Sequence, residues 1–231
     1  MRDDICTIPV SEVFEHNDGC PICRMRDTIE ERMTDYILGD AMMEPDVRIE
    51  TNKTGFCEHH YNNMMSRRGR LQLALMLQTH INEINGEIFK KKLFNTDSKK
   101  AGNAKNITDS CFICSKIEWG LSRMIETVYR CYETQKDFRD MFNSQSMFCL
   151  PHYERLLGGA SKRNMKSYYP EFSENLNRIT GEYSKSLYDD LSKYCTMYDY
   201  RSRDGETDWG NSRDAVERTV AFLNGRVYKE D

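Results

Sequence analysis

The sequence lacks a long apolar run, and this absence excludes a membrane-spanning helix. Its longest purely apolar stretch, Leu73–Leu77, is far shorter than the roughly 20 residues that cross a bilayer. The first residues carry charge at positions 2 to 4 and no apolar stretch follows, so they do not resemble a secretion signal. We therefore expect a cytoplasmic protein without membrane contact, whose nine cysteines are kept out of disulfides by a reducing environment.

Signatures of common enzymes are absent as well. The sequence has no Ser-His-Asp order signature, no glycine-rich phosphate loop, no His-Glu-x-x-His and no paired-carboxylate pattern. We assign no catalytic residue and no organic cofactor. The net charge of −4 argues against broad nucleic-acid binding. The basic stretches 66–70 and 90–92 are interpreted as solvated helix faces, with a local nucleic-acid patch as the alternative.

Strand signals are sparse, and the chain instead repeats itself with helical periodicity. Residues 18–23 (DGCPIC) match 109–114 (DSCFIC), residues 56–61 (FCEHHY) match 148–153 (FCLPHY), and 84–87 match 179–182. Apolar spacing and breakers predict helices over 20–38 and 111–132 and a short segment at 46–51. A third helix is expected from Cys57 and Cys149, and a long fourth one from about 66 and 161.

These patterns predict an all-α fold of two tandem helical repeats, 1–100 and 101–198, packed about a pseudo-twofold axis. Residues 95–109 are expected to be a linker. The extension 199–231 should contain one helix, capped by Asn211 or Ser212 and stopped by Gly225. Gly86 and Gly181 recur inside long helices, so we expect the two helices to approach closely there.

The repeated cysteines and histidines predict two metal sites. A Cys-x-x-Cys turn supplies two thiolates, and a Cys-x-x-His turn supplies the other corners of a tetrahedron. His60 is the ligand rather than His59, because Pro151 occupies the position of His59 in the second copy. We predict two zinc ions per chain, with iron–sulfur centres as the alternative. The predicted ligands are Cys20, Cys23, Cys57 and His60 in the first copy and Cys111, Cys114, Cys149 and His152 in the second.

Other residues carry weaker signals. His59 is interpreted as a surface residue, or as an outer group supporting a ligand. The recurring pairs Arg32 with Asp35 and Arg123 with Glu126, and the recurring Arg48 and Arg139, are interpreted as helix salt bridges; anion binding or hydrogen bonds to the thiolates are the alternative. The remaining predictions place His16 on the surface and His80 on a helix flank, and make Cys6, Cys131 and Cys195 small buried side chains.

The chain resembles a family of uncharacterised cytoplasmic proteins from anaerobic Gram-positive bacteria, classed as a domain of unknown function. The residues that carry the resemblance are Cys20–Cys23, Gly55–Cys57 with His60, Phe148 and Cys149 with His152, Asp199–Arg201 and Trp209-Gly210. The similarity runs nearly end to end. It agrees with the metal motifs and implies no activity.

Two functions are compatible with these features. The first is a non-catalytic helical protein in which two structural zinc sites hold the helices, leaving the surface for a protein or small-ligand partner. The second is a redox or metal-sensing protein that uses iron–sulfur or labile zinc–thiolate sites. The sequence specifies neither the partner nor the oligomeric state.

Overall fold

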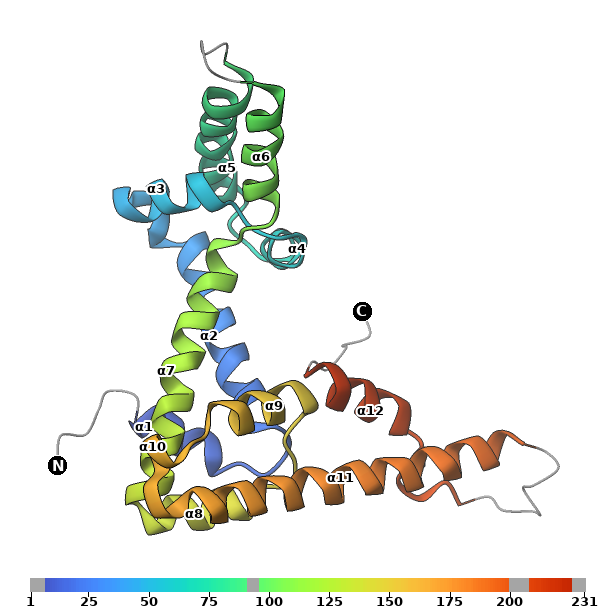
Figure 1. Ribbon diagram of the computed structural model, residues 1–231. Coiled ribbons are helices and arrows are strands. Elements are labelled where there is room, and N and C mark those ends of the chain that lie inside the picture. Colours follow the sequence, from blue (N-terminus) through green and yellow to red (C-terminus); the bar gives the residue numbers. More distant parts are fainter. Residues whose placement is uncertain (1–6, 91–95, 200–207, 226–231) are drawn as a thin grey trace. The chain divides into compact units, whose positions relative to one another are not determined.

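The computed structural model describes residues 7–90, 96–199 and 208–225, and every regular element in these ranges is helical (Figure 1). The all-α prediction is confirmed for this part of the chain. Two compact units are present: unit 1 comprises Met1–Met25 and Ser122–Asp231, and unit 2 comprises Arg26–Leu121. Their boundary falls within helices α2 (Pro21–Leu38) and α7 (Phe112–Thr134). The predicted repeats 1–100 and 101–198 and the extension 199–231 describe a duplication in the sequence, which these two units do not test. That division stays a prediction.

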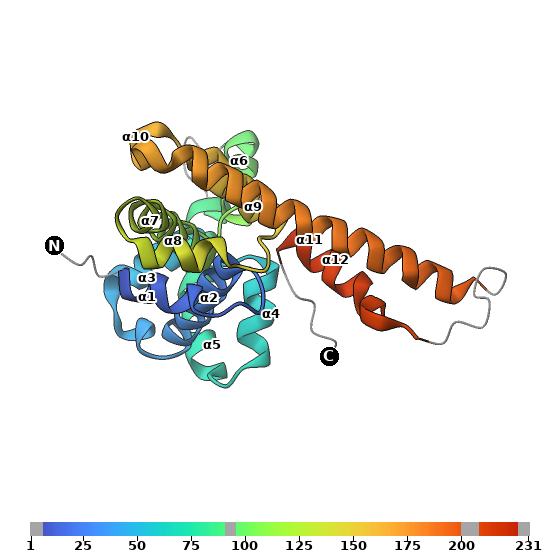
Figure 2. The same ribbon diagram turned by 90° about the horizontal axis from the view of Figure 1, so that it is seen from below.

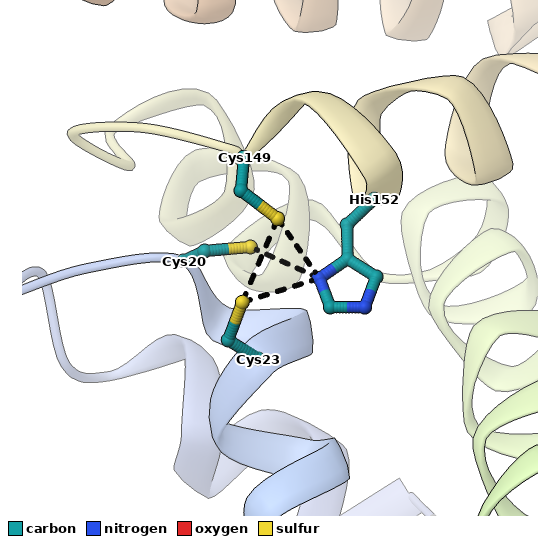
Figure 3. A group of neighbouring side chains, drawn as sticks. All are labelled: Cys20, Cys23, Cys149 and His152. Atoms are coloured by element: carbon teal, nitrogen blue, oxygen red, sulfur yellow. Dashed lines mark hydrogen bonds between the residues drawn. The ribbon is translucent and has the colours of Figure 1, made fainter. Parts of the chain in front are cut away.

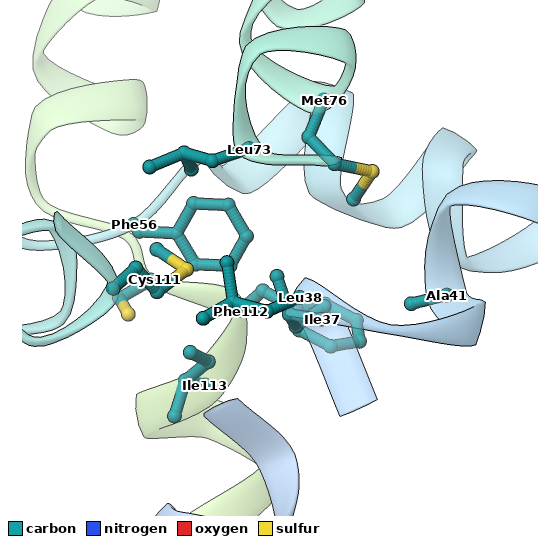
Figure 4. Packing of buried hydrophobic residues seen from close by; sticks show 10 residues of the cluster. Ile37, Leu38, Ala41, Phe56, Leu73, Met76, Cys111, Phe112 and Ile113 are labelled. Carbon is teal, nitrogen blue, oxygen red and sulfur yellow. The ribbon is translucent and has the colours of Figure 1, made fainter. Parts of the chain in front are cut away.

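Unit 2 is built around one apolar core. It contains the end of α2, the start of α7, and η1 (Asp40–Met43), α3 (Pro45–Thr54), α4 (Glu58–Ser66), α5 (Arg70–Ile84), η2 (Asn85–Phe89) and α6 (Asp97–Thr108). Helix α3 packs against α5, and α6 packs against α3 and η2. Figure 4 shows the core, which joins α2, the Phe56 turn, α5 and the start of α7 through Ile37, Leu38, Ala41, Phe56, Met64, Leu73, Met76, Cys111, Phe112 and Ile113.

Unit 1 is organised along one long helix, α11 (Tyr169–Tyr198). Helix α12 (Ala215–Asn224) lies beside it, as both views show (Figures 1 and 2), and packs against α9 (Leu150–Gly159) as well. The other elements are α1 (Thr7–Phe14), α8 (Lys136–Asn143), α10 (Lys162–Met165), η3 (Lys166–Tyr168) and η4 (Gly210–Ser212). Aromatic rings fill the core, with centroid distances of 4.9 Å for Phe14 and Phe138 and 5.0 Å for Phe142 and Phe148.

The five prolines all lie near helix starts. Proline fixes φ near the helical value and lacks an N–H that the first turn would leave unpaired, so it is favourable there. Pro21 directly follows Cys20, and Pro151 directly precedes His152, so these two predicted metal ligands lie at the starts of helices. The prolines are Pro9, Pro21, Pro45, Pro151 and Pro170.

Two local predictions are wrong. Residues 97–108 of the expected linker form helix α6, which begins at the N-cap Thr96, whose hydroxyl accepts a hydrogen bond from the Lys99 amide at 3.3 Å. Its helix-forming lysines and alanines outweigh its low apolar content; Asn95 lies outside the described residues. The N-cap of α12 is Asp214, because Asn211 and Ser212 belong to η4, whereas the predicted stop at Gly225 is confirmed by its φ of 66°.

The close approach expected at the recurring glycines stays a prediction, because Gly86 belongs to unit 2 and Gly181 to unit 1. A Cβ atom added at Gly86 or Gly181 would have no described atom within 4 Å apart from its own helix. Gly86 lies in the π-helical segment η2, and Gly181 lies on the exposed side of α11. Close packing occurs at Gly120 of α7, where a Cβ would stand 3.2 Å from Cδ1 of Ile29 of α2.

The described helices include none with both the length and the apolar character that spanning a bilayer requires.

Candidate metal centres

The eight predicted ligands gather in two groups, but each group combines the two repeats. Cys20 and Cys23 meet Cys149 and His152 in unit 1, which we call the unit 1 centre (Figure 3). Cys111 and Cys114 meet Cys57 and His60 in unit 2, the unit 2 centre. The predicted pairing of Cys-x-x-Cys with Cys-x-x-His inside one repeat is therefore wrong.

Helix α2 explains the exchange. It follows Cys20 directly and has 18 residues, a length of about 27 Å at 1.5 Å per residue. Phe56, the neighbour of Cys57, packs in the same core as Ile37 and Leu38, which end that helix. The chain after α2 thus builds its Cys-x-x-His turn in the core of unit 2, where the start of α7 supplies the matching cysteines.

In the unit 1 centre, three sulfurs surround one imidazole nitrogen. Nδ1 of His152 lies 3.6 Å from Sγ of Cys20, 3.3 Å from that of Cys23 and 3.1 Å from that of Cys149. The sulfurs of Cys23 and Cys149 are 3.5 Å apart. Figure 3 shows the Cys20 and Cys23 side chains at the start of α2 directed toward those of Cys149 and His152 at the start of α9.

The loops that carry the unit 1 ligands are tied by polar contacts. The side chain of Asn17 donates to the carbonyl of Ser144 at 2.9 Å and accepts from the amide of Ser146 at 2.5 Å. Nε2 of Gln145 donates to the carbonyl of Phe14 at 2.7 Å. These bonds join the segment before Cys20 to the segment before Cys149, so the two halves of the centre are held together by the protein itself.

The unit 2 centre has the same arrangement. Nδ1 of His60 lies 3.1 Å from Sγ of Cys57, 3.2 Å from that of Cys111 and 3.5 Å from that of Cys114. The sulfurs of Cys57 and Cys114 are 3.8 Å apart. Cys57 is the N-cap of α4, as Cys149 is of α9, so both Cys-x-x-His turns open a helix.

Gly55 brings the two halves of the unit 2 centre together. Its carbonyl accepts a hydrogen bond from the amide of Phe112 at 3.0 Å, next to Cys111. Gly55 has φ 59° and ψ −153°, a conformation that side chains rarely tolerate, and a Cβ would lie 2.7 Å from Nε2 of His80. His80 itself is buried, with Nδ1 2.8 Å from the carbonyl of Asn52, so its prediction as a helix-flank residue is wrong.

Both ligand sets fit one tetrahedral metal ion. Zinc bonds of about 2.3 Å to sulfur and about 2.0–2.1 Å to nitrogen give tetrahedral edges of about 3.8 Å and about 3.6 Å. The sulfur–sulfur separations of 3.5 and 3.8 Å and the sulfur–nitrogen separations of 3.1 to 3.6 Å are close to these edges. All six cysteines are free, since a disulfide would need about 2.0 Å. Each set can therefore enclose a single ion with no ligand position left open.

Glu30 of α2 adds a carboxylate to the unit 2 centre alone. Its Oε1 lies 3.2 Å from Nε2 of His60, the nitrogen that faces away from the sulfurs, and 2.6 Å from Nε2 of His59. The imidazoles of His60 and His59 lower the pKa of Glu30 to about 2. Glu30 has no acidic counterpart in the second copy and stands far upstream of His60, so the adjacent histidines are the one signal of it in the sequence. His59 is thus both half-exposed and a support for the centre.

The cysteines of each set have unequal proton affinities. Burial raises the pKa of Cys111, but its contact with His60 and the hydrogen bonds from the backbone of Cys114 and Cys57 together outweigh burial and lower the pKa to about 6. Burial and the neighbouring Cys111 raise the pKa of Cys114 above its usual range. Burial opposes protonation of His60, while Cys111 and Glu30 favour it and raise its pKa to about 10. A metal ion entering this set must therefore displace protons.

Unit 1 shows the same inequality between its paired cysteines. Burial works against the thiolate of Cys20, yet its contacts with Cys149, Cys23 and His152 lower its pKa well below the usual value. The contacts of Cys23 with Cys149 and Cys20 raise the pKa of Cys23. In each centre the first cysteine of the Cys-x-x-Cys turn is thus the better thiolate.

The recurring arginines act on backbone carbonyls. Arg48 donates to the carbonyls of Met42 and Leu75, and Arg139 donates to those of Tyr132 and Glu133 near the end of α7. The carbonyls of Tyr132 and Glu133 lie in the last turn of α7, where a cation is favourable because it meets the negative end of the helix dipole; Leu75 lies inside α5. Asp35 pairs with Arg67 at 2.6 Å, not with Arg32, so that predicted helix pair is wrong.

The remaining predictions divide. His16 is exposed and Cys131 is buried, as expected, whereas Cys195 is exposed and Cys6 lies outside the described residues. Arg68, Arg70 and Lys90 are exposed, in agreement with solvated faces; Lys91 and Lys92 lie outside the described residues. Tyr200 and Arg201, two of the residues that carry the family resemblance, also lie outside the described residues.

Fold and site together define an all-helical protein with two clusters of three cysteines and one histidine. The chain belongs to the family of unknown function DUF6062, whose model matches residues 1–230. No curated protein and no solved structure matches it. The anaerobic Gram-positive source and the cytoplasmic location implied by the resemblance stay predictions.

Proposed function

We propose that this protein is a cytoplasmic, non-catalytic binding protein whose helices are held by two structural zinc ions. The observation that carries the proposal is the geometry of the ligand atoms, which lie at the edge lengths of a zinc tetrahedron in both centres. Four protein ligands leave no position for a substrate or an activated water, and such closed sites are typically structural.

The place of each centre in the chain supports a structural role. Cys20 and His152 come from segments 132 residues apart, and Cys57 and Cys114 from segments 57 residues apart. A zinc ion that joins such distant segments restricts the unfolded chain and couples metal binding to folding. The two centres would then fix the positions of the helix starts, and residues on the protein surface would bind the partner.

The exchange of half-motifs supports the predicted pseudo-twofold relation of the repeats. Each centre takes its Cys-x-x-Cys turn from one copy and its Cys-x-x-His turn from the other. A twofold operation that interchanges the copies turns one ligand set into the other. We infer that the two repeats are related in this way.

Exposed apolar side chains support a protein partner. Tyr188 and Tyr198 of α11 are 71% and 68% exposed, and Leu223 of α12 is 50% exposed. Large aromatic side chains are enriched in protein interfaces. We propose that a protein partner binds unit 1 at α11 and α12. We propose no binding to nucleic acid or to a membrane.

The test is anaerobic purification followed by metal analysis and an absorption spectrum. We expect two zinc ions per chain, no visible colour, and loss of helicity and of the cooperative melting transition after treatment with a strong chelator. A metal-free protein that keeps its helicity and melting temperature would refute the structural role.

A redox or metal-sensing role is the second candidate. The exposed thiol of Cys114 favours it, because accessible metal-bound thiolates react with oxidants and lose their metal. If the purified protein contained iron and showed a brown absorbance, the centres would be iron–sulfur centres instead of zinc sites, and the redox or sensing function would be supported.

A further inference from the structure

The two centres differ in how their sulfurs meet solvent. In the unit 1 centre, Cys20, Cys149 and His152 are 7%, 1% and 6% exposed, and Sγ of the half-buried Cys23 lies 3.2 Å from the carbonyl of Gly225. In the unit 2 centre, Cys114 is exposed and Cys57 is half-buried. A dissolved reagent can therefore reach two neighbouring sulfurs of the unit 2 centre.

These two sulfurs also suit each other as reaction partners. Sγ of Cys57 lies 3.8 Å from Sγ of Cys114, whereas the third sulfur, that of Cys111, belongs to a buried residue. With zinc bound, coordinating thiols are deprotonated, so both are thiolates regardless of their metal-free state. The unit 1 pair Cys23 and Cys149 is as close, at 3.5 Å, but Cys149 is buried.

We propose that the unit 2 centre is a peroxide-reactive zinc–thiolate site, in which Cys114 is oxidised first and Cys57 then forms a disulfide with it. This proposal rests on the proposed zinc occupancy. The unit 1 centre is the inert one. The proposal deepens the role of the centres: one zinc ion maintains the fold permanently, and the other is released by an oxidant.

The chemistry balances with hydrogen peroxide as the oxidant. The Cys114 thiolate attacks one peroxide oxygen, so an S–O bond forms, the O–O bond breaks and hydroxide leaves. The Cys57 thiolate then attacks the Cys114 sulfur, forming the S–S bond and expelling the second hydroxide. The two thiolates lose two electrons, the peroxide becomes two waters after proton uptake, and zinc leaves with half of its ligands gone.

The outer residues of the unit 2 centre agree with this division of roles. Glu30 and His59 are replaced at the matching repeat positions by Leu121 and Pro151, so both members of the pair belong to the unit 2 centre only. A carboxylate that holds His60 in place keeps one ligand oriented while the sulfurs react. The zinc ion can then bind again once the disulfide is reduced.

The test uses the full chain with zinc bound, in a Cys195→Ser background that removes the exposed cysteine which the described residues hold outside the centres. Metal content before peroxide tests the proposed zinc occupancy separately. Peroxide is then added in limiting amounts, with native mass spectrometry to count zinc and peptide mapping to locate oxidised cysteines. We expect loss of one of the two zinc ions and a Cys57–Cys114 disulfide, with the unit 1 cysteines unmodified.

Three results would overturn the proposal: equal rates of zinc loss from both centres, earlier loss from the unit 1 centre, or a disulfide other than Cys57–Cys114. Reduction by dithiothreitol followed by added zinc should restore the two-zinc species. Failure to recover it would contradict a reversible switch.

Discussion

At the scale of single residues, Glu30 makes the two centres chemically different. Its carboxylate stands behind the ligand His60 and beside His59, whereas Leu121 occupies its repeat position. A carboxylate in this position orients a metal-binding imidazole and strengthens it as a donor. The unit 2 centre therefore combines an exposed cysteine, Cys114, with a well-supported histidine.

Replacing Glu30 by glutamine tests this support. We expect Glu30→Gln to weaken zinc binding at the unit 2 centre about 10- to 100-fold, since the amide lacks the charge that favours the bound imidazole. Chelator competition followed by native mass spectrometry measures the two ions separately. The matched control is Glu31→Gln, an exposed neighbour, which should leave both affinities unchanged. Equal weakening at both centres would contradict the assignment.

Zinc affinity should rise with pH. In the metal-free set, His60 has a pKa of about 10 and the pKa of Cys114 is raised, so both hold protons at pH 7 to 9 that zinc must displace. These two displaced protons by themselves make the affinity of the unit 2 centre increase by at least about 100-fold per pH unit in this range. Below a pH of about 6, Cys111 takes up a further proton and the dependence steepens. Competition titrations at several pH values measure it, and a flat profile would contradict the assigned protonation.

The identity of the ligands could be predicted from sequence, but their support could not. Cys-x-x-Cys and Cys-x-x-His turns recur, and Pro151 excludes His59 as a ligand. Glu30 gives no such signal, because its partner lies 29 residues away and only the fold brings the two together. The burial of His80 under Gly55 is hidden for the same reason.

At the scale of the helices, the two glycine environments predict opposite effects of alanine. Gly181 lies in the middle of α11 on its exposed side, with open space around it. Because alanine favours the helix more than glycine does, Gly181→Ala should stabilise unit 1 by about 1 kcal/mol. Gly55→Ala should instead destabilise unit 2 by roughly 1–3 kcal/mol, because of its positive φ and the contact with His80. Urea unfolding of the zinc-bound protein measures both, and the same sign for both would refute this assignment.

Helix starts were predictable where proline or a ligand turn marks them, as at Pro21 and Cys149. Helix α6 was not, because it has no buried residue, and a helix without an apolar face resembles a linker. The buried face of α5 does not follow hydrophobicity alone, since Ile81 is 53% exposed while Met76 and His80 are buried.

At the scale of the whole molecule, the pairing of half-motifs is the feature that double variants can test. Cys23→Ser/Cys149→Ser removes two ligands from one centre, so the chain should retain one zinc ion. Cys23→Ser/Cys57→Ser removes one ligand from each, so both ions should be lost after a chelator wash. Pairing within each repeat would give the reverse pattern. Native mass spectrometry supplies the count.

The pairing could not be predicted from sequence for a chemical reason. Either Cys-x-x-Cys turn with either Cys-x-x-His turn gives the same ligand set, so composition and spacing do not distinguish the alternatives. The packing of unit 2 decides between them, because Phe56, next to Cys57, shares a core with Leu38 and with Cys111 and so holds the Cys57 turn beside the cysteines of α7.

The crossed pairing also fixes an order of assembly during synthesis. The four ligands of the unit 2 centre are all translated by residue 114, whereas Cys20 and Cys23, made first, wait for His152. At about 5–20 residues per second, the ribosome leaves these two thiols without their partners for several seconds. The first ligands to be synthesised are thus the last to be enclosed, and the unit 2 centre can receive its metal before the ligand set of the unit 1 centre is complete.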